Sequence, residues 1–69
     1  MIRFDLELYQ ETAVLQGIQD YQDIAIIHPQ VHDRFIDCRI TESQYDMDLT
    51  EKEFSNYVLY LTVAGAMIP

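Results

Sequence analysis

The pattern of apolar and polar positions divides the chain into short elements. Apolar and charged residues alternate over residues 2–8, and a period of two is typical of a half-buried strand. Further along, Val14, Ile18 and Tyr21 recur at intervals of four and three. This spacing predicts one amphipathic helix over about residues 10–22.

The middle of the chain predicts a β-hairpin. Residues 23–29 contain a compact run of Ile and Ala, and residues 34–41 alternate again. A tight turn at Asp33 and Arg34 joins the two segments and sets their register. In that register Pro29 lies opposite Cys38, which favours a bulge or a sheet edge. The inward-facing pairs are Ile27 with Ile40 and Val31 with Ile36.

Two more elements complete the pattern. Residues 45–49 alternate apolar side chains with aspartates, which predicts another short strand, paired with residues 36–40. The segment Thr50-Glu51-Lys52-Glu53 has the form of a capping box, so we expect a helix from Glu51 to about Ala64 that ends near Gly65. The chain therefore predicts one small two-layer α+β domain over residues 1–69. Its order is β-α-β-β-β-α, with a mostly antiparallel sheet and two helices on one face.

Charge and composition narrow the functional classes. Twelve acidic residues stand against four basic ones, which gives a net charge of −8. So few cations cannot form a basic patch, and we expect no binding to nucleic acid. Cys38 is the single cysteine, and the N-terminus has no signal-peptide pattern, so we expect a soluble cytoplasmic protein with no membrane span.

Few residues suggest catalysis or metal binding. His28 and His32 have a metal-binding spacing only on a helix, and on a strand they lie about 13 Å apart, too far for one ion. The pattern places Cys38 inward as a core residue rather than a nucleophile. We therefore expect no metal site, no cofactor and no catalytic residue.

Three aspartates form a candidate polar face. Asp37, Asp46 and Asp48 fall on the outer side of the predicted sheet, with Asp37 opposite Asp48. Like charges in that arrangement destabilise a sheet, so a divalent cation or a basic peptide could neutralise them. An ordinary solvated face is the simpler interpretation.

The last helix carries two apolar stripes, and no charged residue follows Glu53. One stripe can cover the sheet. A two-layer domain of this size has nothing to cover the second, so we expect a partner there, most simply in a two-fold homodimer. The alternative is that the tail after Gly65 folds back over the first helix. The expected interface residues are Tyr57, Tyr60, Val63 and Met67.

Several segments of the chain resemble the small HxsD-type proteins of the His-Xaa-Ser system. That family is associated with radical-SAM enzymes that modify peptides, so the resemblance implies an accessory, non-catalytic role and supplies no catalytic residues. The chain departs from the family in its uncharged C-terminal segment. The segments that carry the resemblance are Tyr9-Gln10-Glu11-Thr12-Ala13-Val14, Tyr21-Gln22-Asp23, Tyr45-Asp46 and Glu53-Phe54-Ser55-Asn56-Tyr57-Val58-Leu59.

The sequence thus predicts a non-enzymatic interaction module, an adaptor or accessory subunit that forms a homodimer. The alternative that its charge favours is an acidic mimic of nucleic acid that blocks a basic nucleic-acid-binding protein. An enzyme is the third class, and it would need a pocket at the dimer interface.

Overall fold

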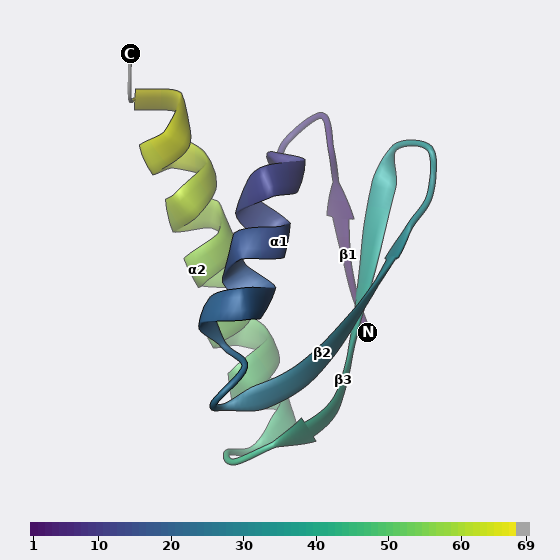
Figure 1. Ribbon diagram of the computed structural model, residues 1–69, viewed down its shortest axis with the longest axis vertical. Coiled ribbons are helices and arrows are strands. Elements are labelled where there is room, and N and C mark those ends of the chain that lie inside the picture. The colour runs from purple at the N-terminus through teal and green to yellow at the C-terminus, as the bar shows by residue number, and fades with distance from the viewer. Residues whose placement is uncertain (68–69) are drawn as a thin grey trace.

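The computed structural model describes the backbone of residues 1–67 and the side chains of residues 1–65. It is an α+β fold with the order β1-α1-β2-β3-α2, in which both helices cover the same face of the sheet (Figure 1). The fold class and the side on which the helices pack were predicted correctly. The elements are β1 (Ile2–Asp5), α1 (Glu11–Asp20), β2 (Ala25–Val31), β3 (Phe35–Ser43) and α2 (Met47–Met67).

The β2–β3 hairpin has the predicted register. Ile27 pairs with Ile40, Val31 with Ile36, and Pro29 with Cys38. Pro29 lies on an edge strand, as its missing N–H requires, because the strand order is β1-β3-β2. Val31 is nevertheless exposed, because it lies on the edge strand β2, whereas its partner Ile36 lies on the central strand β3 and is buried.

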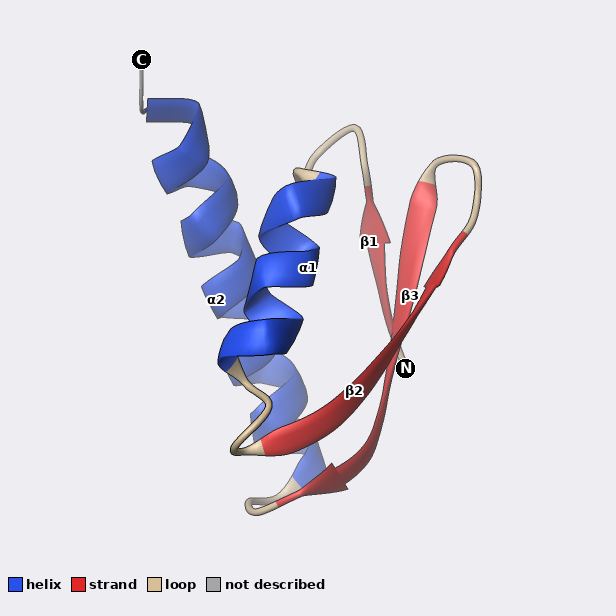
Figure 2. Cartoon of the chain, viewed as in Figure 1, coloured by secondary structure: helices blue, strands red, loops and turns tan. Residues whose placement is uncertain are grey.

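The predicted strand at residues 45–49 is wrong, because α2 begins there (Figure 2). The carboxylate of Asp46 accepts the backbone N–H of Leu49 at 3.2 Å, and its carbonyl accepts the N–H of Thr50. These are the two bonds of an N-cap, so the cap lies four residues before the one expected at Thr50, and the helix starts at Met47. The place expected for this strand beside β3 is taken by β1, with Phe4 opposite Ile36.

The chain leaves β1 earlier than the alternation suggests. Asp5 accepts the N–H of Glu7 on its side chain and those of Leu8 and Tyr9 on its carbonyl, which turns the chain toward α1. Although α2 was expected to end near Gly65, it remains helical to Met67, and any return of the later tail lies outside the described residues.

The core lies between the covered face of the sheet and the inner faces of the two helices. Gly17 allows the helices to approach closely, because a Cβ atom there would lie 3.1 Å from Val58 and 3.3 Å from Phe54. This contact explains a glycine inside a helix. The buried apolar residues are Phe4, Ala13, Val14, Ala25, Ile27, Ile36, Cys38, Phe54 and Val58.

Candidate functional site

Three apolar side chains are exposed together on the second half of α2. Leu59, Tyr60 and Val63 are 46%, 65% and 50% exposed, and helical spacings of three and four make them neighbours. We call these three residues the α2 outer face. The sequence predicted Tyr60 and Val63 as interface residues and missed Leu59, because the expected outer stripe contained only Tyr60, Val63 and Met67.

Tyr57 differs from these three because its hydroxyl is engaged within the chain. It donates a hydrogen bond to the Asp20 carboxylate at 2.6 Å, and this bond is the main cause that raises the pKa of Tyr57. Its ring lies between those of Tyr21 and Tyr60, with centroids 5.5 and 6.3 Å away. Tyr57 therefore joins α2 to α1. The side chain of Met67, the fourth expected interface residue, lies outside the described residues.

The three aspartates of the expected polar face are not brought together. Asp37 is buried on β3, whereas Asp46 caps α2 and Asp48 lies in its first turn. The expected opposition of Asp37 and Asp48 is wrong because residues 45–49 do not form a strand. Asp37 instead lies opposite Arg3 of β1.

Asp37 is held by two side chains on the face of the sheet that the helices do not cover, which we call the open face. Arg3 donates to both carboxylate oxygens, at 2.7 and 3.0 Å, and the His32 ring nitrogen lies 3.1 Å from one of them. Hydrogen bonding to Arg3 is the largest cause that lowers the pKa of Asp37, and its charge and that of His32 act in the same direction. The Arg3 guanidinium also lies 5.0 Å from the centre of the Phe35 ring. The polar groups at this point therefore satisfy one another.

The two histidines have separate neighbours. His28 lies 3.2 Å from the hydroxyl of Thr41, while His32 contacts Asp37. Within residues 1–65, no group of three or more His, Cys, Asp and Glu side chains is placed to hold a metal ion.

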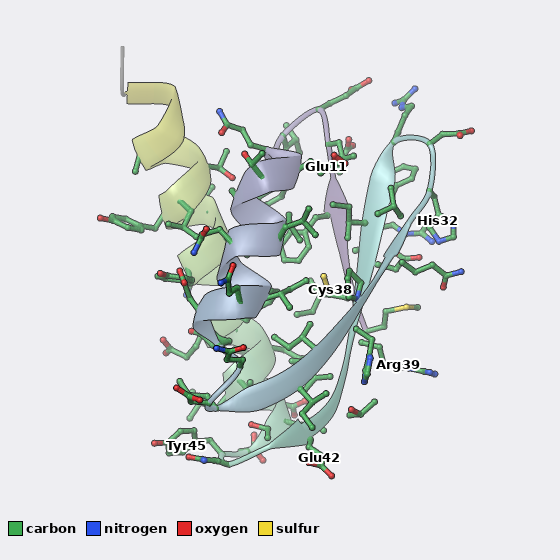
Figure 3. The ribbon with its side chains drawn as sticks, in the orientation of Figure 1. Glu11, His32, Cys38, Arg39, Glu42 and Tyr45 are labelled. Carbon is green, nitrogen blue, oxygen red and sulfur yellow. The ribbon has the colours of Figure 1, made fainter. Side chains whose placement is uncertain are left out.

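Cys38 occupies the predicted core position. Its side chain is fully buried and points from β3 toward the helices, while that of Arg39 points away from them (Figure 3). Burial is the main cause that raises the pKa of the thiol to about 11. The thiol is therefore protonated at neutral pH and shielded from reagents.

A groove that the sequence did not predict lies where β3 leads into α2. Its volume is about 280 Å³, and Tyr45 marks this end of the molecule in Figure 3. The sequence signal that reveals it is the N-cap at Asp46, because a helix from Met47 turns Leu49 and Glu53 to the same side. We call this cavity the end groove. Its lining residues are Tyr21, Ile24, Tyr45, Leu49, Thr50 and Glu53.

Neither helix, over the described residues, combines the length and the apolar character that a membrane crossing requires. Comparison with protein-family models, with curated proteins and with solved structures finds no significant match for this chain.

Proposed function

We propose that this chain is a non-enzymatic interaction module that forms a two-fold homodimer through the α2 outer face. The observation that carries the proposal is the joint exposure of Leu59, Tyr60 and Val63 on a helix whose other side buries Phe54 and Val58. Adjacent exposed apolar side chains on a small protein are typical of an interaction surface.

A second copy is the occupant that the charge distribution favours. All charged residues precede Phe54, so the α2 outer face lies in the one long segment without charge. With a net charge of −8, two copies repel each other, and contact through an uncharged helix face reduces that repulsion. A two-fold axis places the same patch on both copies, so one apolar face completes the interface.

The resemblance to HxsD-type proteins supports the same class of function. It implies an accessory subunit that acts beside a peptide-modifying enzyme, and the dimer provides a surface for such a role without catalytic residues of its own. Co-purification with a radical-SAM enzyme from cells that contain both tests this extension of the proposal.

Charge substitutions on the α2 outer face test the homodimer. Val63→Glu and Tyr60→Glu place a carboxylate in the interface, and we expect both variants to be folded monomers by light scattering at tens of micromolar. Gln19→Glu is the matched control, because it adds the same charge to an exposed position of α1. If both α2 variants keep the dimer mass of the parent chain, the interface lies elsewhere.

A mimic of nucleic acid is the second candidate function, and the placement of charge favours it. Arg3, Arg34 and Arg39 all belong to the sheet and its hairpin, which leaves Lys52 as the only Lys or Arg on the helices. The helices therefore carry five acidic residues against one basic residue, a net charge of 1 − 5 = −4. This function requires binding to a basic nucleic-acid-binding domain that weakens steeply with salt. Binding that salt does not change would exclude it.

A further inference from the structure

The end groove is built by three segments that meet at one end of the molecule. Tyr21 and Ile24 come from the turn between α1 and β2, Tyr45 from the turn before α2, and Leu49 from the first turns of α2. The Tyr45 N–H donates to the Ser43 hydroxyl at 3.2 Å, and that hydroxyl lies 2.6 Å from the hydroxyl of Thr50. These bonds fix the turn that carries Tyr45 against the helix.

The lining of the end groove favours an apolar occupant. Tyr45 and Leu49 both line the groove and are 61% and 50% exposed, so they present apolar surface to solvent there. The hydroxyl of Thr50, buried beneath them, is already paired with Ser43. An apolar side chain that enters between Tyr45 and Leu49 therefore buries apolar surface and leaves that hydroxyl bond intact.

Within the described part of the chain, no Lys or Arg lines the end groove or the open cavity beside it, although Lys52 follows Leu49 by three residues on α2. Glu53 lines the groove, and Asp23 and Glu42 line the adjoining open cavity that shares Ile24 with it. Asp46 and Asp48 flank Leu49 at the start of α2. The ion pairs formed within residues 1–65 use the carboxylates of Glu7, Asp37 and Glu51. None of the five acidic side chains around the groove takes part in these pairs.

We propose that the end groove binds a cationic segment of a partner protein, with one apolar side chain of that segment held between Tyr45 and Leu49. Lys or Arg residues on either side of the apolar side chain meet the carboxylates of Glu53 and Asp23. The apolar anchor supplies the position, and the charges supply attraction and selectivity. This surface shares no residue with the α2 outer face, so the two proposals succeed or fail separately.

A short peptide of defined sequence tests this proposal. The probe is the acetylated and amidated peptide Lys-Arg-Leu-Lys-Arg, titrated into the ¹⁵N-labelled chain to millimolar concentration. We expect saturable NMR shifts in residues 21–24 and 45–53. The same peptide with Ser in place of Leu keeps every charge, and we expect it to bind at least about ten times more weakly.

Variants of the chain separate the groove from the rest of the acidic surface. Leu49→Ser and Tyr45→Ser each change an exposed side chain of the groove, so the far-ultraviolet circular dichroism spectrum should stay unchanged. We expect each substitution to weaken binding of the leucine peptide about tenfold. Leu15→Ser is the matched control at an exposed position of α1 outside both proposed surfaces, and we expect it to bind the peptide as the parent chain does.

Three outcomes would overturn the proposal. Equal affinity for the leucine and serine peptides would show that charge alone drives binding, as the mimic function predicts. Shifts centred on residues 59–63 would place the peptide on the α2 outer face. An absence of saturable shifts at millimolar peptide would show that the end groove does not bind a cationic segment.

Discussion

The open face of the sheet and the outer face of α2 are both exposed, yet they differ in how their side chains are satisfied. On the sheet, Arg3 binds Asp37 with two hydrogen bonds and covers the ring of Phe35. On α2, Tyr60 and Val63 project apolar surface into solvent. Exposure alone therefore does not identify a docking surface, because a surface whose polar groups pair with one another gains little from a partner.

Truncation of one side chain on each side of α2 tests whether its outer face is unpacked in the monomer. Phe54→Ala removes a fully buried ring, and we expect it to lower the free energy of unfolding by about 3–5 kcal/mol. Val63→Ala shortens an exposed side chain and should change the stability of the monomer by less than about 0.5 kcal/mol. Urea denaturation at low protein concentration measures both. Comparable losses would mean that the outer side of α2 is packed within the monomer.

The close contact between the helices predicts a second, smaller effect. Gly17→Ala gains helix propensity but forces a methyl group against Val58 and Phe54, and we expect a net loss of about 1 kcal/mol. Gly65→Ala is the matched control, because its Cβ meets the exposed, flexible end of Gln10, and it should not lower stability. Thermal unfolding of the two variants checks this expectation. A Gly17→Ala chain as stable as the parent would show that α1 and α2 have room to separate.

The pair on the open sheet face predicts a pH effect. Because its pKa is lower in the folded chain, Asp37 stabilises the fold above the unfolded pKa of about 4 and loses that contribution as the pH falls through the folded value. Arg3→Met removes the main cause of the shift. We therefore expect a shallower loss of stability between neutral and acidic pH than in the parent chain.

Arg34→Met is the control for this pH effect. Arg34 contacts Glu7 at 3.0 Å, but both side chains are well exposed, and such pairs contribute little to stability. The free energy of unfolding of the Arg34→Met variant should depend on pH as that of the parent chain does, measured by urea denaturation at each pH. Identical pH profiles for Arg3→Met and the parent would contradict the role given to Asp37.

The hairpin shows what the sequence determines well. Alternation fixes which side chains face the core, and a two-residue turn leaves one register that agrees with it, so the pairs Ile27–Ile40 and Pro29–Cys38 were predicted correctly. The strand predicted at residues 45–49 is wrong because two local signals compete there. Tyr45, Met47 and Leu49 alternate as in a strand, but Asp46 caps a helix, and the cap prevails.

That error also explains which parts of the candidate sites were missed. The end groove needs Tyr45 and Leu49 on a turn and a helix, so a strand at residues 45–49 conceals it. The polar partner of Asp37 was missed for a related reason, because β1 and not residues 45–49 pairs with β3. Sequence pattern gives the side on which a residue lies, whereas the neighbour across the sheet depends on which strands pair.

Sedimentation equilibrium of the unmodified chain from low to high micromolar concentration tests the homodimer directly. We expect a reversible shift from the monomer mass of 8.1 kDa to twice that value, with the Val63→Glu chain remaining monomeric throughout. A parent chain that stays monomeric over the whole range would contradict the proposal that a second copy covers the α2 outer face.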